Sequence, residues 1–311
     1  MLEIDLILSA SSANMGYYIG FADAILKSNK VKIRNVYACS GGSWVAPYVI
    51  TNRMSEAIEW YESLFYIENS NIKNYKVFND HLQLFTLFER IPYIGVWVTL
   101  LARTLFFLLV GTFFKSYNLN FLDEFLKRLS ENEKAMLKGV QVVTTNLTPY
   151  KSKWHKVSFN SLKKSIIASS TNGLNTPAVE INKFSQIDGI FTEMIPLSNL
   201  PKDDILKVVL TFDIVALDKF DATFNKFNLP IMGIIDYMSN LAMFGCLQNA
   251  RKSLKIHLSE RNDTVVYSCK MGWGLNDQQL FKSITNTNIA KGLLKTGAEH
   301  AKEFLETQGV C

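Results

Sequence analysis

Short aliphatic runs alternate with stretches of helical spacing over the first fifty residues. Residues 2–9 form a short aliphatic run that ends in small side chains, and residues 33–38 form a second run. Such runs are typical of buried parallel strands. Residues 16–26 and 42–50 instead place apolar side chains along one side of a helix. The alternation of strand and helix predicts a parallel sheet with helices on its faces.

The same two patterns return in the second half of the chain, after a long interruption. Apolar periodicity predicts amphipathic helices, and aliphatic runs predict further strands. The predicted helices cover residues 121–129, 161–169 and 289–305, and the predicted strands cover 140–145, 157–159, 205–212 and 264–269. We therefore predict one α/β domain over residues 1–311, with residues 54–117 as an embedded helical insertion.

The insertion is rich in aromatics, and its residues 94–114 contain one charge, Arg103. That length matches a bilayer crossing, but a central arginine costs roughly 2.5–3.5 kcal/mol on insertion scales. Three interpretations stay open: a helix lying in a membrane interface, a buried core helix, and a transmembrane span. The interfacial interpretation predicts that five aromatic side chains contact lipid: Trp97, Phe106, Phe107, Phe113 and Phe114.

Charge and cysteine content narrow the function classes. The net charge is +5, with 33 basic and 28 acidic residues spread along the chain. A dispersed surplus favours anionic surfaces mildly and does not indicate a nucleic-acid partner. The four cysteines are far apart and form no zinc or disulfide pattern, and the first residues do not resemble a secretory signal. We expect a cytoplasmic protein that associates with membranes peripherally.

A candidate nucleophile lies between the second predicted strand and the helix that follows it. Ser40 has small residues two positions before and after it, Ala38 and Gly42, with Cys39 and Gly41 between. A nucleophile elbow needs such neighbours, because its tight turn leaves no room for larger side chains. The turn would also point the Gly41 N–H towards a developing oxyanion. The alternative is a structural turn in which Ser40 only caps the helix.

Such a serine needs a base, and the histidines are poor candidates. The chain has four, His81, His155, His257 and His300, and none lies in a segment with a special turn signature. A carboxylate in a partly dry pocket can serve instead, because desolvation raises its pKa. Asp188 precedes Gly189, whose backbone freedom suits a loop that aims the acid at the edge of the sheet. Taken alone, an Asp-Gly pair is an ordinary turn.

Together these segments resemble the patatin-like phospholipase family, whose elbow is G-x-S-x-G and whose catalytic aspartate lies in a D-G-G or D-G-A loop. Residues 38–42 are similar to the elbow, and Asp188-Gly189-Ile190, with Pro196 beyond, is similar to the loop. Residues 166–170, followed by Pro177, resemble the small-residue run that precedes the aspartate. The resemblance covers about residues 4–50 and 138–215. It implies a three-layer α/β fold and a Ser40–Asp188 dyad without histidine.

The chain departs from the family in the oxyanion loop after the first strand. The family carries G-G-G-x-R-G there, whereas this chain has Ala10, Ser11 and Ser12 in place of the glycines and Asn14 in place of the arginine. Glycines permit positive φ and close approach. The resemblance implies that residues 10–12, with Gly41, form the oxyanion hole. A lost donor costs roughly 2.7–4 kcal/mol of transition-state stabilisation.

The resemblance implies a lipid acyl hydrolase of the phospholipase A or lysophospholipase type, working through an acyl-enzyme. An enzyme of this type requires neither a metal nor an organic cofactor, and its expected partners are a phospholipid substrate and a membrane surface. A catalytically impaired fold that binds lipid or protein is the alternative, and an α/β hydrolase with a histidine base is a third. The sequence leaves open the acyl position, the headgroup preference and the oligomeric state.

Overall fold

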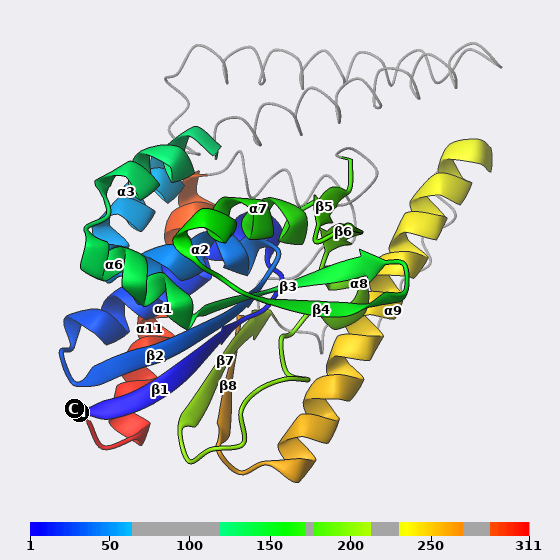
Figure 1. Cartoon of the computed structure of the whole chain (residues 1–311). Helices are drawn as coiled ribbons and strands as arrows, with labels where there is room; N and C mark the ends of the chain where they lie inside the picture. The colour runs from blue at the N-terminus through cyan, green and yellow to red at the C-terminus, as the bar shows by residue number, and fades with distance from the viewer. Residues whose placement is uncertain (64–118, 172–176, 213–229, 270–286, 311) are drawn as a thin grey trace.

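A computed structural model describes residues 1–63, 119–171, 177–212, 230–269 and 287–310 (Figure 1). Within these ranges the side chains of residues 12, 13, 230–244 and 287 are not described. Of the predicted insertion, the description covers only residues 54–63, which form the helix α3 (Met54–Ser63). The segment 94–114, with its five predicted lipid-contacting aromatics, lies outside the described residues.

The described strands form one mixed, mostly parallel sheet. Its order is β5-β6-β3-β2-β1-β7-β8, and β4 pairs with β3 off this path. The pairs β3–β2, β2–β1, β1–β7 and β7–β8 are parallel, while β4 and β6 pair antiparallel with β3. The strands are β1 (Leu2–Leu8), β2 (Val31–Cys39), β3 (Val140–Leu147), β4 (Tyr150–Lys156), β5 (Val179–Ile181), β6 (Phe184–Asp188), β7 (Leu206–Phe212) and β8 (Thr264–Cys269). The predicted parallel sheet is confirmed.

Helices cover both faces of this sheet, with α1, α2 and α11 on one face and α9 on the other (Figure 1). The described helices besides α3 are α1 (Gly16–Lys27), α2 (Gly41–Ile50), a helix over residues 119–128, α6 (Glu131–Met136), α7 (Phe159–Ser169), α8 (Ile190–Glu193), α9 (Pro230–Glu260) and α11 (Thr287–Thr307), with short 3-10 turns η1 (Ser12–Met15) and η2 (Leu137–Gly139).

Successive side chains of the central strands belong to two separate hydrophobic cores, one on each face of the sheet. In β1, Leu6 and Leu8 pack with α1 and α2, whereas Ile7 packs with residues that follow α8 and with α9. In β2, Ala38 and Cys39 divide in the same way. Successive side chains of a strand point to opposite faces, so a strand that is apolar at every position requires cover on both faces.

Several elements of the fold differ from the prediction. The expected strand at 157–159 is wrong, because Ser158 caps α7, and its hydroxyl and that of Ser161 form a reciprocal capping box. The strand lies earlier, as β4, whose exposed lysines Lys151, Lys153 and Lys156 hide it from an apolar pattern. The antiparallel strands β5 and β6 and the helix α9 were not predicted either.

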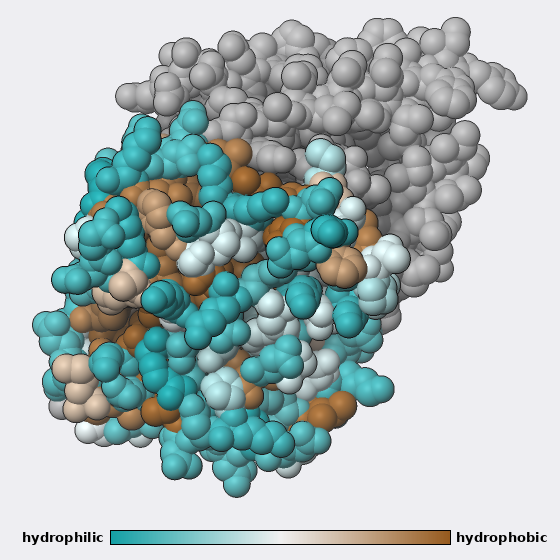
Figure 2. Space-filling model, in the orientation of Figure 1, coloured by the Kyte–Doolittle hydropathy of each residue, from teal (hydrophilic) through white to brown (hydrophobic). Residues whose placement is uncertain are grey.

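The face shown in Figure 2 is mostly hydrophilic over the described residues. Large hydrophobic side chains that are exposed include Leu147, Tyr150 and Phe184. Among the described helices, none has both the length and the apolar character needed to cross a membrane.

Candidate active site

The strands β2 and β6 end facing each other along one edge of β3. The strand β4 pairs with β3 from Gln141 to Leu147 and fills its other edge, so β2 and β6 share the remaining one. The last residue of β2, Cys39, is paired with Val143, and the last residue of β6, Asp188, is paired with Thr144. Because β2 runs parallel and β6 antiparallel to β3, their carboxyl ends meet. This topology brings Ser40 next to Asp188.

Ser40 occupies a strained turn between β2 and α2. Its φ of 51° and ψ of −123° lie in a region that side-chain-bearing residues rarely adopt. Gly42, two residues on, leaves no room for a side chain, since a Cβ there would lie 2.8 Å from Leu8 Cβ and 2.9 Å from Leu8 O. Ala38, two residues before, is fully buried. This is the geometry expected of a nucleophile elbow.

The side chains of Ser40 and Asp188 form a direct hydrogen bond. Ser40 Oγ donates to Asp188 Oδ2 at 2.6 Å, and both residues are buried. The other carboxylate oxygen, Oδ1, accepts the Ile190 N–H at 2.9 Å and faces Cys39 Sγ at 3.9 Å. One oxygen is therefore oriented by the main chain, while the other is aligned with the serine hydroxyl.

Burial prepares this carboxylate to act as a base near neutral pH. Desolvation raises the pKa of Asp188 to about 7, although the hydrogen bonds from Ser40, the Ile190 N–H and Cys39 lower it. Burial also raises the pKa of the Cys39 thiol well above its usual range, so that Cys39 stays protonated beside the carboxylate. A base with a pKa near the working pH combines availability with proton affinity.

Gly189 allows the approach of the aspartate. A Cβ at Gly189 would lie 2.6 Å from Val143 O and 2.9 Å from Cys39 Sγ. The chain can therefore turn from β6 into α8 directly against β3 only if this residue lacks a side chain.

The predicted oxyanion donors fall into two groups. Gly41 opens α2, and neither its N–H nor that of Gly42 has an acceptor among the described residues. Both can serve an anion at this helix N-terminus. The Ala10 N–H, by contrast, donates to Met194 O at 2.9 Å, which does not fit its predicted role in the oxyanion hole. Ser11 is buried in the loop after β1, and Ser12 begins η1 with its side chain undescribed.

The described histidines form hydrogen bonds with residues other than Ser40 and Asp188. His155 Nε2 lies 2.9 Å from Thr144 Oγ1, and His257 Nε2 lies 3.1 Å from Thr264 Oγ1. His300 Nδ1 lies 2.8 Å from Tyr17 OH. His81 lies outside the described residues. Among the described titratable side chains, it is Asp188 that accepts a hydrogen bond from the Ser40 hydroxyl.

Two residues at the end of α7 bind the main chain of the pair, and sequence reasoning assigned them no role. The Ser169 hydroxyl accepts the Ser40 N–H at 2.9 Å, and Thr171 O accepts the Asp188 N–H at 2.7 Å. Ser169 lies in the small-residue run 166–170, and Thr171 directly follows that run. This run is the sequence signal that indicates the segment, but it does not single out either residue.

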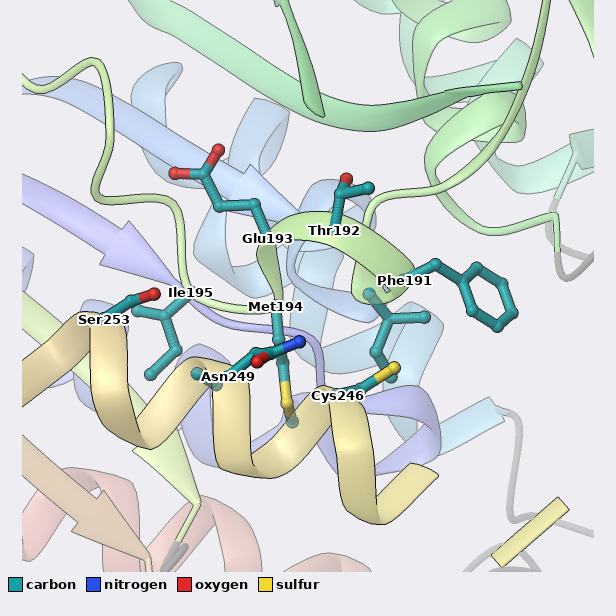
Figure 3. A pocket seen from close by; sticks show the side chains of 10 residues that line it. Phe191, Thr192, Glu193, Met194, Ile195, Cys246, Asn249 and Ser253 are labelled. Carbon is teal, nitrogen blue, oxygen red and sulfur yellow. The ribbon is translucent and has the colours of Figure 1, made fainter. Parts of the chain in front are cut away.

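A small pocket lies between α8 and α9, lined by residues that follow the Asp188-Gly189 turn and by residues of α9 (Figure 3). Met194 lies between the two helices, and Cys246 and Asn249 reach across from α9. The lining residue Glu193 is fixed in place, because its carboxylate accepts hydrogen bonds from Trp154 Nε1 at 2.9 Å and from the Leu197 N–H at 2.8 Å. No group of three or more potential metal ligands occurs among the described residues.

The fold and the site together define a class: α/β proteins with a buried serine–aspartate pair at a strained strand-to-helix turn. The structure is similar to that of VipD from Legionella pneumophila, with a TM-score of 0.40 and 13% identity, covering 94% of this chain and 67% of that one. It is also similar to a structure of full-length SpcU in complex with full-length ExoU from the type III secretion system of Pseudomonas aeruginosa. There the TM-score is 0.35 and the identity 12%, over 96% of this chain and 52% of that one. No family model and no curated protein sequence matches the chain.

Proposed function

We propose that this protein is a lipid acyl-ester hydrolase of the patatin-like kind, with Ser40 as nucleophile and Asp188 as its base. The observation that carries the proposal is the 2.6 Å hydrogen bond from Ser40 Oγ to Asp188 Oδ2. It occurs where the serine is strained into a turn and the carboxylate is buried enough to be basic. A serine that only caps a helix needs neither feature.

The chemistry proceeds in two steps. Ser40 Oγ attacks the ester carbonyl carbon while its proton passes to Asp188 Oδ2, and the oxyanion accepts hydrogen bonds from the Gly41 and Gly42 N–H groups. The C–O bond to the alcohol then breaks, and Asp188 returns the proton to the leaving oxygen. Water next attacks the acyl-enzyme and gives a proton to Asp188. The bond to Ser40 Oγ breaks, the fatty acid leaves, and the proton returns to Oγ.

The substrate class rests on the motifs around the pair. The elbow at residues 38–42 and the Asp188-Gly189 loop resemble those of patatin-like phospholipases. A phospholipid or lysophospholipid is therefore the proposed substrate, with a neutral glyceride second. The net charge of +5 suits an anionic membrane surface, to which the aromatic segment 94–114 would add apolar contacts.

Turnover of a fluorescent phospholipid in vesicles tests the proposal. We expect Ser40→Ala and Asp188→Asn each to lower kcat/KM by at least about 10³-fold, because each removes a group that takes part in both steps. His155→Ala should keep most of the activity, since His155 contacts neither residue. Circular dichroism would establish that all variants fold. Retained activity in a folded Ser40→Ala protein would refute the proposal.

A lipid-binding protein without turnover is the second candidate. The observation in its favour is the Ala10 N–H, which is bonded to Met194 O in the loop where the family places oxyanion donors. For this candidate, wild type and Ser40→Ala would bind vesicles equally in co-sedimentation, and neither would release fatty acid. Release by the wild type alone would exclude it.

A further inference from the structure

The end of α7 fixes the main chain of both members of the pair. Ser169 is the last residue of α7 and is fully buried. Its Oγ accepts the Ser40 N–H at 2.9 Å and donates to Val143 O at 2.6 Å. Two residues later, Thr171 O accepts the Asp188 N–H at 2.7 Å. Ser169 and Thr171 thus contact the backbone of Ser40 and of Asp188, two residues that are 148 positions apart.

The Ser169 hydroxyl occupies a gap in the ladder between β2 and β3. Cys39 is paired with Val143, so a continued parallel register would pair Ser40 with Thr144 and direct the Ser40 N–H to Val143 O. Thr144 is paired with Asp188 instead, and the Ser169 hydroxyl stands between the Ser40 N–H and Val143 O. The Ser169 hydroxyl pairs with both backbone groups. The chain can therefore turn away from β2 at Ser40 while the Ser40 N–H and the Val143 carbonyl keep hydrogen-bond partners.

Val143 O also contacts the other side of the site. A Cβ on Gly189 would lie 2.6 Å from this oxygen, so the Asp188-Gly189 turn packs directly on it. The Ser169 hydroxyl therefore holds the carbonyl against which the aspartate loop rests, and also the amide of the nucleophile. A shift of Ser40 relative to Asp188 would require one of these contacts to break.

We propose that Ser169 is a positioning residue, whose hydroxyl sets the distance between Ser40 Oγ and the Asp188 carboxylate. This inference rests on the proposed function and deepens it. The hydroxyl contacts no reacting atom; it acts through the main chain of Ser40 and Val143. Displacements of about 1 Å can lower a rate roughly 100-fold, so the effect belongs to kcat rather than to substrate binding.

Two variants separate the hydrogen bond from packing, and a third is a matched control. Ser169→Ala removes the hydroxyl, and Ser169→Cys fills the same space with a weak hydrogen-bonding group. Ser170→Ala removes the neighbouring hydroxyl, which donates to Ile166 O within α7 and does not touch the pair. We expect Ser169→Ala and Ser169→Cys to lower kcat about 10- to 100-fold with KM little changed, and Ser170→Ala to match the wild type.

The pH profile supplies a readout that simple destabilisation would not move. The bond from Ser40 lowers the pKa of Asp188, so a weakened bond should move the acid limb of kcat/KM to higher pH in both Ser169 variants. Folded Ser169 variants with the rate and acid limb of the wild type would overturn the positioning role and leave the proposed function standing. A wild type without turnover would overturn both.

Discussion

At the scale of single residues, the site stores unfavourable energy. Ser40 has a strained backbone, and Asp188 is a buried carboxyl group whose hydrogen-bond partners among the described residues include no cation. Gly42 and Gly189 make both placements possible, because any side chain there would collide with Leu8 or Val143. Such arrangements persist only when the surrounding structure holds them, and they cluster at functional sites.

Asp188 should make the protein less stable as pH rises. Burial raises its pKa from 3.8 to about 7, so between these values the folded protein holds a proton that the unfolded chain releases. Stability from this group is present at about pH 4 and is lost as pH rises through 7. Asp188→Asn should therefore raise stability at pH 8 by roughly 2–4 kcal/mol, and much less at pH 4.

Thermal melts of wild type and Asp188→Asn at both pH values measure this effect. A difference in Tm that widens from pH 4 to pH 8 is the expected result. A difference that does not change with pH would show that the carboxyl group of Asp188 is not destabilised by burial.

At the scale of elements, α1 and α11 pack with their backbones in close approach. A Cβ on Gly20 would lie 2.0 Å from Leu294 O, and one on Gly297 would lie 2.1 Å from Tyr17 O. The obstructing atoms are backbone, so the helices would have to move apart. The lack of a side chain at Gly20 thus permits this helix contact.

Two glycines of α11 give opposite expectations. Gly297→Ala should destabilise the protein by about 3 kcal/mol, because the new methyl group collides with the Tyr17 carbonyl. Gly292→Ala, in the same helix, meets nothing within 4 Å and should stabilise it by about 0.5–1 kcal/mol through helix propensity. Urea denaturation measures both. Equal effects of the two substitutions would contradict the close packing of α1 and α11.

The elements differ in how far their sequence predicts them. β1, β2, β7 and β8 each contain an aliphatic or apolar run, and their approximate positions follow from that pattern. β4 lies at the edge of the sheet with exposed lysines, and β5 has three residues, so neither shows an apolar signal. The meeting of β2 and β6 follows from pairing with β3, which local pattern does not encode.

The residues of the candidate site also differ in how far the sequence predicts them. Ser40 and Asp188 were predicted from the turn chemistry around them and from the resemblance of their motifs. Ser169 was not, because its importance comes from a hydroxyl inserted between Ser40 and Val143, which are far from it in sequence. The sequence also did not show that the Ala10 N–H is already hydrogen-bonded, because its acceptor, Met194 O, is far from it in the chain.

At the scale of the whole molecule, the two ends of the sheet have different character. The pair lies at the carboxyl ends of the parallel strands, where ligands of open α/β sheets bind. At the amino ends, the buried Lys207 Nζ contacts Asp203 and Asp263, and Arg34 bridges Asp203 and Asp5. These ion pairs compensate the buried charges of Asp5 and Lys207. The buried ion pairs and the serine–aspartate pair thus lie towards opposite ends of the parallel strands.

The most direct test of the central claim is a covalent adduct on Ser40. Intact-mass and peptide analysis after exposure to a fluorophosphonate ester, which phosphonylates activated serines with loss of fluoride, should show one adduct on the peptide containing Ser40. Asp188→Asn should slow its formation by at least about 100-fold, because the serine then lacks its base. A folded wild-type protein that remains unmodified at Ser40, or an Asp188→Asn variant modified at the wild-type rate, would contradict the account.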